Sequence, residues 1–572
     1  MKNNIKYIVA TALIFVFSAC SDEFLEFVPT DQPTLGSWYQ NEGQIQATTA
    51  TLYGEPWFRF NDKFSWAAGD GMAGDLYQDF QDEGQLFFYS FNENNSIIAQ
   101  GWTALYDVVA KANLIINDMP PIASGYGVSQ DIINAGLAES RFMRAMAYYL
   151  LVDYWEDVPI IENPAANIAS GELNVPKHTR ASVYEFIKRD LEFAAANLPE
   201  VSSPGRITSW SAKGMLAKLH VTLGQISVGG GSFGSAADFD LAAGYAADVI
   251  NNSGLTLVPD YADLYRVTGE NSPEALFSLQ WTNAGYATGN SRQAVFARST
   301  RITQDGVAWG GGKCMTVNFV DNLIANAGGN SDNDLRRPSI YMENGDIVSD
   351  FGGYEYQILS RDAAGDQLEG PTSTLNSLKK YVIGSISDHG FAITNQDSPL
   401  DQHMLRLADV YLLYTEAKIG AGNTTSDVAS YNAVRARAGL PAKSSVTYLD
   451  VFNERRVELG LEGFAWQEVR RRSYRDQSET LAYLAAQERN TVYFRIDPND
   501  NLESDPAGYE ALAAGETGIG DSDNDGTLNI NEQSPVTIAA TDLVLPIPAN
   551  DVVSNPLLHK DVPAEAYDFG GE

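Results

Sequence analysis

The 572-residue chain is poor in three things that would point to common chemistries. It has two cysteines, Cys20 and Cys314, which are too few for a disulfide framework. Its five histidines show no paired metal-ligand spacing and no H-E-x-x-H motif. Basic residues number 38 against 74 acidic ones, and the resulting formal net charge of -36 repels nucleic acid and anionic membrane surfaces. These shortages argue against a disulfide scaffold, a zinc hydrolase and a nucleic-acid-binding protein.

Long apolar runs are also missing after the first twenty residues, so we expect no transmembrane helix there. Residues 1–19 read as a signal peptide, with Lys2 and Lys6 before a short apolar stretch at residues 7–17. Ser18, Ala19 and Cys20 resemble a bacterial lipobox, which implies cleavage before Cys20 and lipid attachment to it. The alternative is an ordinary secretory signal with an incidental cysteine. The acidic residues directly after Cys20 resemble the surface-export signal of outward-facing lipoproteins.

Residues 40–258 show the period of amphipathic helices. One helical face of residues 141–155 collects Phe142, Ala145, Met146, Tyr149 and Val152. Similar patterns occupy residues 101–117, 181–197, 209–224 and 238–251. Turn signals separate them at Pro120-Pro121, Pro204-Gly205 and residues 229–234. Paired helices of this length predict a helix–turn–helix solenoid.

The amino-acid composition changes at residues 275–401, where glycine and asparagine are frequent and helical periodicity is weak. Residues 275–281 read as a short buried strand, and we expect long loops and small sheets around it. Further helices are predicted at residues 404–420, 426–438 and 448–472, and a strand-like run at residues 543–547. The sequence thus predicts a mostly α protein with small β elements.

Five stretches, together with the lipobox, resemble the SusD/RagB family of starch-utilisation-type surface lipoproteins. They are residues 141–161 (RFMRAMAYYLLVDYWEDVPII), 406–417 (RLADVYLLYTEA), 431–440 (YNAVRARAGL), 454–466 (ERRVELGLEGFAW) and 543–548 (LVLPIP) followed by Asn555-Pro556. The order and spread of these motifs cover nearly the whole chain. Their charged members are expected to be salt-bridged structural residues, namely Arg141, Arg144, Glu454, Arg455, Arg456 and Glu458.

The resemblance implies one SusD-like domain over residues 20–572, with a tetratricopeptide-like scaffold mainly at residues 40–258 and 404–472. That scaffold would contact a SusC-like TonB-dependent transporter, while loops mainly at residues 275–401 bind oligosaccharide. The chain would be a non-catalytic lipoprotein of the outer membrane, facing the cell exterior. Some family members bind peptides or glycoprotein glycans instead, so a peptide or glycoprotein receptor is the alternative. A surface hydrolase and a pure scaffold that joins surface proteins are further alternatives.

Two regions combine flat aromatic rings with amides and carboxylates, as glycan binding requires. The first, a glycine-rich segment, offers Trp66, Asp70, Asp75 and Tyr77. The second offers Trp281, Asn283, Tyr286, Trp309, Tyr354 and Tyr356. The competing interpretation is that these aromatics belong to the core, as most tryptophans do.

Residues 521–532 fit the calcium-loop pattern D-x-D-x-D-G-x5-E without a mismatch. The predicted Ca²⁺ ligands are Asp521, Asp523, Asp525, Thr527 through its backbone carbonyl, Asn529 and Glu532. No flanking EF-hand helices are evident, so we expect a structural clip. The alternative is a solvated acidic loop that needs no ion.

No catalytic residue is assigned. Residues 230–234 match G-x-S-x-G, but that motif needs a preceding strand and a following helix, whereas here it joins two helices. Residues 310–313 lack the first glycine and the final Ser/Thr of a phosphate-binding loop. A glycosidase needs two placed carboxylates, and 74 acidic residues leave that possibility open.

Overall fold

The computed structural model describes residues 35–570 except 79, 298–299, 304–312, 344, 357–359, 362–366, 369–376, 394–395, 490–492, 497–501, 506–516 and 519–535. The chain is mostly helical with small sheets, which confirms the fold class predicted from the sequence. No helix in this described part is both long enough and apolar enough to cross a membrane.

The first part of the chain forms the helical scaffold, and its side-chain caps explain several helix starts. Asn95 accepts hydrogen bonds from the backbone N–H groups of Ile97 and Ile98. Thr179 accepts one from Ser182 in the same way. The helices are α2 (Glu42–Ala50), α3 (Gln81–Phe87), α4 (Ser96–Gly125), α5 (Gln130–Trp155), α6 (Pro164–Ser170), α7 (Arg180–Asn197), α8 (Ser209–Val228) and α9 (Ala237–Asn252).

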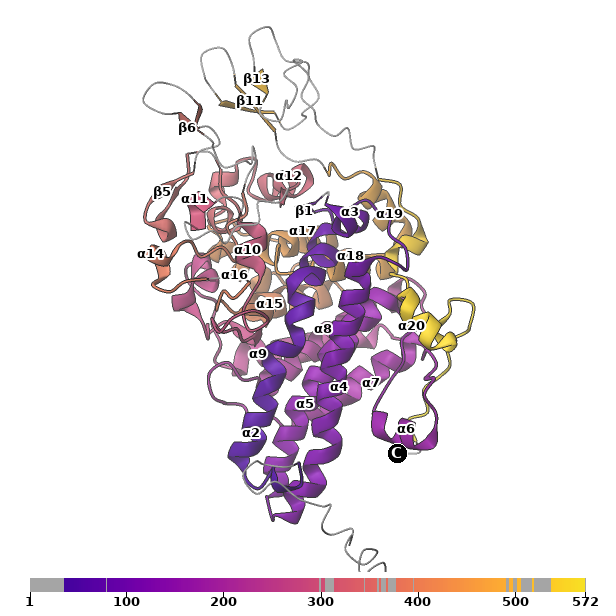
Figure 1. Ribbon diagram of the computed structural model, residues 1–572. Coiled ribbons are helices and arrows are strands. Elements are labelled where there is room, and N and C mark those ends of the chain that lie inside the picture. The colour runs from indigo at the N-terminus through magenta and orange to yellow at the C-terminus, as the bar shows by residue number, and fades with distance from the viewer. Residues whose placement is uncertain are drawn as a thin grey trace, which may run out of the picture.

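Scaffold helices that follow one another in sequence also pack on one another. Helix α4 packs on α5, α5 on α7, α7 on α8 and α8 on α9, as the predicted solenoid requires. Figure 1 shows α2, α4 and α5 side by side in the lower half of the molecule. The predicted break at Pro120-Pro121 is wrong, because α4 continues through both prolines to Gly125.

The loop-rich part joins the scaffold through a two-stranded antiparallel sheet. Strand β2 (Ala275–Leu279), predicted from its apolar run, pairs with β8 (Gln402–Arg406). Figure 1 places most of this part above and to the left of the scaffold. Its helices are α10 (Arg292–Phe296), α11 (Thr300–Thr303), α12 (Val317–Asn326), α13 (Arg337–Ile340) and α14 (Ile386–His389). Its other strands are β3 (Cys314–Met315), β4 (Ile347–Val348), β5 (Tyr354–Glu355), β6 (Ser360–Arg361) and β7 (Gln367–Leu368).

The last part of the chain returns to helices, with two corrections to the predicted boundaries. Residues 404–406 belong to β8 rather than to the helix that follows. The single helix predicted at residues 448–472 is two helices, because Leu461 and Gly463 have φ angles of 63° and 93°. The helices are α15 (Leu407–Ile419), α16 (Ala429–Arg437), α17 (Tyr448–Glu458), α18 (Ala465–Arg475), α19 (Gln477–Ala485) and α20 (Ala549–Ser554). The strands are β9 (Thr424–Thr425), β10 (Val446–Thr447), β11 (Tyr493–Ile496), β12 (Leu502–Asp505) and β13 (Thr517–Gly518).

The strand-like run predicted at residues 543–547 is no strand. It follows a 3₁₀ turn over Ala540–Leu543 and binds the end of α5 instead. The Leu545 amide donates to the Tyr154 carbonyl at 2.8 Å, and the Trp155 indole N–H donates to the Pro546 carbonyl at 3.0 Å. The C-terminal segment therefore closes the end of the central scaffold helix.

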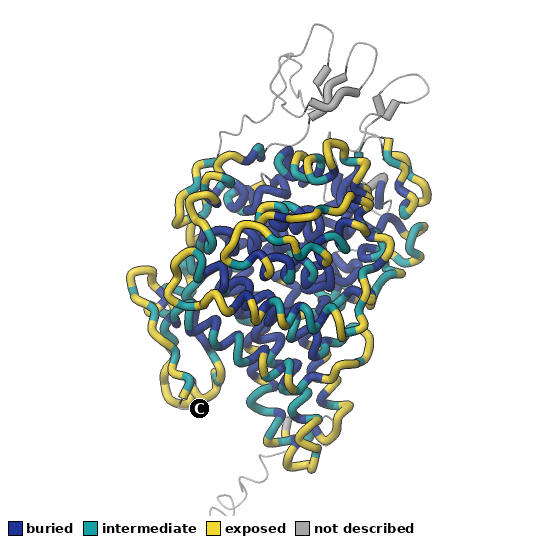
Figure 2. The backbone as a smooth tube through the Cα atoms, turned by 180° about the vertical axis from the view of Figure 1, so that it is seen from behind, coloured by how far each residue is buried: buried dark blue, intermediate teal, exposed yellow. Residues whose placement is uncertain are grey.

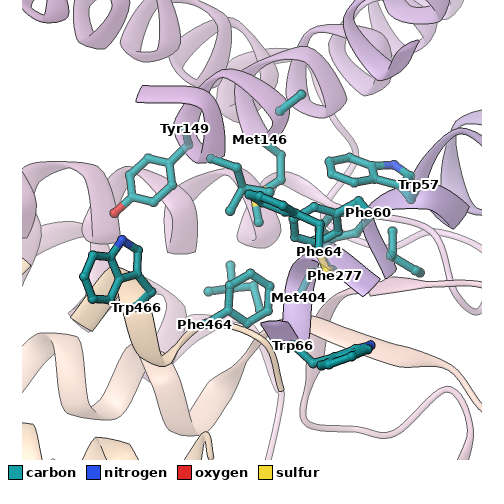
Figure 3. Close-up of a cluster of buried hydrophobic side chains, with 14 of the residues drawn as sticks. Trp57, Phe60, Phe64, Trp66, Met146, Tyr149, Phe277, Met404, Phe464 and Trp466 are labelled. Atoms are coloured by element: carbon teal, nitrogen blue, oxygen red, sulfur yellow. The ribbon is translucent and has the colours of Figure 1, made fainter. Parts of the chain in front are cut away.

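One hydrophobic core runs through all of these parts. The buried backbone gathers in the middle of the molecule, with exposed stretches outside it (Figure 2). Side chains from the N-terminal segment, α5, both strands of the β2–β8 pair and the start of α18 meet in one cluster (Figure 3). The labelled members are Trp57, Phe60, Phe64, Trp66, Met146, Tyr149, Phe277, Met404, Phe464 and Trp466.

The charged residues of the family motifs form ion pairs, and all six are buried except Arg141, whose side chain is 32% exposed. Arg144 binds Asp190 at 2.8 Å, and Arg336 binds both Glu454 at 2.7 Å and Glu458 at 2.9 Å. The remaining motif residues have buried ionic partners too, which confirms the structural role predicted for all six: Arg141 and Arg144 with Asp190, Arg455 with Asp409, Arg456 with Asp75, and Glu454 and Glu458 with arginines.

Candidate ligand-binding surface

The first predicted binding region is a helical turn in the core rather than an exposed glycine-rich loop. Trp66 is fully buried, and its indole N–H donates to the Asp62 carbonyl at 2.7 Å. The ammonium group of Lys313 lies 4.7 Å from the centre of the Trp66 ring and pairs with Glu83 at 3.1 Å. A sugar therefore has no open ring face at Trp66, and the prediction of a ligand contact there is wrong.

Asp70, Asp75 and Tyr77 are buried as well, the first two against α17 and the turn before α18, and Tyr77 against Phe87 and Cys314. Burial raises the pKa of Asp70 to about 8, and its Oδ1 accepts from the Gly463 amide at 3.3 Å. Asp75 is buried beside Arg456, and Tyr77 lies in β1 (Leu76–Tyr77), which pairs with β3. These three residues are structural, so the prediction that they touch ligand is also wrong.

An exposed aromatic ring is found in the second predicted region. The Tyr286 side chain is 63% exposed, and its ring centre lies 5.1 Å from that of Phe58 in an edge-on contact. Phe58 in turn contacts Trp281 at 6.3 Å, and both of these rings are buried. Trp281 is therefore a support for the exposed ring and not itself an open stacking face.

The loop that carries Tyr286 is held by its own hydrogen bonds. The Thr282 amide donates to the Thr288 carbonyl at 2.9 Å, and Gly285 takes a φ of 108° that favours glycine. Asn283 is exposed, and its side-chain amide donates to the Ala392 carbonyl, which ties the loop to the segment after α14. The loop thus presents a fixed aromatic ring and an amide on the same short turn.

Asp62 and Gln396 form a polar pair that the sequence argument missed. Asp62 stands four residues after Phe58, within a π-helical turn over Phe60–Phe64, and Gln396 is buried. Burial raises the pKa of Asp62 to about 6, and the Gln396 side-chain amide donates to its Oδ1. We call the exposed residues Asn283 and Tyr286 the Tyr286 surface.

The remaining predicted residues do not join this surface. Tyr356 is buried, with its hydroxyl 2.8 Å from that of Ser377, and so is a core residue. Tyr354 is half-buried in β5, which pairs with β4. The residues that lie outside the described part of the chain are Cys20, Trp309, Asp521, Asp523, Asp525, Thr527, Asn529 and Glu532.

Comparison with known proteins places these features in a class. The family model of the SusD family matches residues 273–563, and a model described as starch-binding associating with outer membrane matches residues 46–221. A SusD-like protein of Bacteroides ovatus is 32% identical over the whole of this chain and 99% of its own.

Solved structures agree. A crystal structure with xylogluco-oligosaccharide is 29% identical, has a TM-score of 0.76 and covers 92% of this chain and 99% of its own. A laminarin binding SusD-like protein is 20% identical, with a TM-score of 0.62 and coverages of 90% and 98%, and so supports the fold. Fold and surface define a helical-scaffold protein with a loop-borne aromatic patch. The chain belongs to the SusD family.

Proposed function

We propose that this protein is a non-catalytic surface lipoprotein that captures oligosaccharides and delivers them to a SusC-like TonB-dependent transporter. The observation that carries the proposal is the exposed Tyr286 ring on the same loop as the exposed residue Asn283. The relative solved with xylogluco-oligosaccharide, at 29% identity over nearly its full length, supports a glycan as the ligand.

The chemistry of the Tyr286 surface suits a sugar. An aromatic ring covers the apolar C–H face of a pyranose, while amides and carboxylates bind its hydroxyl groups. The buried rings of Phe58 and Trp281 hold Tyr286 in place, so little side-chain entropy is lost when a sugar stacks on it.

The same surface argues for binding without turnover. A glycosidase places two carboxyl groups across the scissile bond. Residues 282–288, the loop that carries the Tyr286 surface, contain no carboxyl side chain. An aromatic ring and an amide without a carboxyl group fit recognition of a sugar better than acid–base chemistry.

Calorimetry on residues 21–572 against a panel of neutral polysaccharides and their oligosaccharides tests the proposal. We expect binding to one glycan class and no new reducing ends after prolonged incubation. Product release would favour a surface hydrolase. If no glycan of the panel bound but peptides did, the peptide-receptor alternative would be favoured.

Two further parts of the proposal concern the ends of the chain. A lipid on Cys20 would anchor the protein to the outer membrane, facing the exterior, and Cys20→Ser should release it from the membrane fraction. The pattern at residues 521–532 supports a structural Ca²⁺ site, with the six ligands named above. Co-purification with a TonB-dependent transporter from the native membrane tests the partner.

A further inference from the structure

A polar cavity lies in the helical scaffold, apart from the Tyr286 surface. Its volume is about 490 Å³, within the range of small-ligand sites. It opens where the end of α5, the start of α7, the end of α8 and the α18–α19 junction meet. Residues that line it include Glu156, Arg180, Gly229, Arg470, Tyr474 and Arg475, which we call the arginine pocket.

Glu156 organises the pocket and stands in a strained backbone conformation. It ends α5 with φ 60° and ψ −88°, a region that a residue with a Cβ rarely adopts. Its Oε1 accepts from Arg180 Nη1 at 2.8 Å and from Arg470 Nη2 at 2.6 Å. One carboxylate oxygen thus serves two guanidinium groups, which leaves an excess of positive charge.

The two guanidinium groups are held rigidly. Arg180 and Arg470 lie over the Tyr474 ring, with their Cζ atoms 5.0 and 4.9 Å from its centre. Arg470 also donates from Nε to the Asp153 carbonyl at 3.0 Å, and its side chain is only 2% exposed. Arg180, whose side chain is 23% exposed, is thus a fixed donor that can meet an oxyanion with little loss of conformational freedom, whereas the buried Arg470 contributes positive charge.

Arg475 adds a third positive charge. It donates to Gln225 Oε1 at 2.9 Å, to the Gly420 carbonyl at 3.0 Å and to the Gly422 carbonyl, which are all uncharged acceptors. Within the described residues it forms no ion pair. Asp476 also lines the pocket, but its carboxylate caps α19 by accepting from the Glu479 amide at 2.9 Å. Three arginines and two engaged carboxylates line the pocket, so its lining carries a net positive charge in a chain of net charge -36.

The glycine loop with the G-x-S-x-G pattern forms one wall. A Cβ atom on Gly229 would lie 1.9 Å from the Tyr474 carbonyl oxygen, and one on Gly231 would lie 2.4 Å from the Ile226 side chain. Glycine at these positions lets the loop pack closely and leaves the space beside Tyr474 open. Glycine at these two positions therefore shapes the pocket.

We infer that the arginine pocket is a second binding site, for the carboxylate or sulfate group of an acidic sugar. The guanidinium group of arginine can donate two parallel hydrogen bonds to a planar or tetrahedral oxyanion. A neutral sugar has no such group. Only the naming of a sugar rests on the proposed function, since the oxyanion chemistry comes from the pocket itself.

Calorimetry of residues 21–572 with galacturonate, galactose 6-sulfate, galactose and inorganic sulfate tests the inference. We expect both acidic sugars to bind and galactose not to bind. Arg475→Gln and Arg180→Gln should each weaken binding at least about tenfold. Arg189→Gln, which removes an exposed arginine elsewhere on α7, should leave it unchanged.

Glu156→Gly is expected to increase the affinity, and a misfolded variant would not show such an increase. It removes both the competing carboxylate and the strained Cβ, so acidic sugars should bind about tenfold more tightly. Any of three results would overturn the inference. Galactose could bind as tightly as the acidic sugars, inorganic sulfate alone could bind as tightly as they do, or none of the three pocket substitutions could change the affinity. Neutral-glycan binding that depends on Tyr286, measured on the same samples, keeps the proposed function separate from this result.

Discussion

Arg456 of α17 donates from Nε to Oδ1 of Asp75 at 3.1 Å, which joins residues 381 positions apart in the sequence. Both side chains are buried. Burial alone raises the pKa of Asp75, and the guanidinium group opposes that rise. The contact assigns Asp75 to the internal framework of the protein.

Asp75→Asn should therefore destabilise the protein without weakening glycan binding. A buried guanidinium that loses its carboxylate costs about 3–5 kcal/mol of unfolding free energy. Urea denaturation measures the loss, and calorimetry on the folded fraction measures the affinity. As a control, Glu55→Gln breaks the exposed pair with Lys111 and should change stability by at most about 1 kcal/mol. If the variant kept its stability but lost its affinity for glycan, Asp75 would instead belong to the binding site.

Tyr286→Ala should weaken glycan binding and leave the fold intact. Loss of one aromatic stacking face costs about 1–3 kcal/mol, on the scale known for bases stacked on aromatic rings. Tyr286→Phe keeps the ring and should retain most of the affinity. Tyr126→Ala removes a tyrosine that is 48% exposed at the end of α4, and serves as the matched control. Undiminished affinity in Tyr286→Ala would rule out stacking at this ring.

Calcium should raise the thermal stability of the protein if residues 521–532 bind it. Extracellular calcium sites have dissociation constants of about 10⁻⁴–10⁻³ M, so the effect should saturate in the millimolar range. Scanning calorimetry with calcium and with EDTA measures the shift. Glu532→Gln should abolish it, because the bidentate ligand is lost, whereas magnesium should not replace calcium. Identical melting curves in calcium and EDTA would show that this acidic loop binds no calcium.

Stability should also depend on pH through Glu270 and Asp401. Burial raises the pKa of each to about 7, and the charge of Glu270 adds to the effect on Asp401. In the folded state these two carboxyl groups then keep protons that they release at about pH 4 in the unfolded state. Stability from this pair is therefore lost as pH rises from about 4 to 7 and is constant above that.

Glu270→Gln isolates this contribution. The variant should lose less stability than the wild type between about pH 5 and pH 8, while other buried carboxyl groups cancel in the comparison. Urea midpoints at several pH values give the measurement. Parallel curves for the two proteins would show that the pair does not titrate in this range.

The scaffold could be predicted from the sequence because helical periodicity is a local property. The apolar face of residues 141–155 is buried in α5, and the strand expected near residue 275 is β2. The breaks were harder to predict, since the turn at Leu461 depends on positive φ angles that no local pattern announces.

The binding surface was predictable only in part. Asn283 and Tyr286 stand in a loop whose composition already favours exposure, and the structure places both at the surface. Trp66 has a similar composition around it, but Lys313, far along the chain, covers its ring. Tertiary contacts of this kind decide which aromatic is open, and one sequence does not contain them.

The hydrogen bonds from Leu545 and Trp155 that close the end of α5 also set an order of assembly. Scaffold helices pack on sequence neighbours, so they can form while the chain is still being made. The end of α5 gains its last partners only when a segment about 390 residues later has been synthesised. A chain that stops before Leu545 would therefore leave these two hydrogen bonds at the end of α5 unmade.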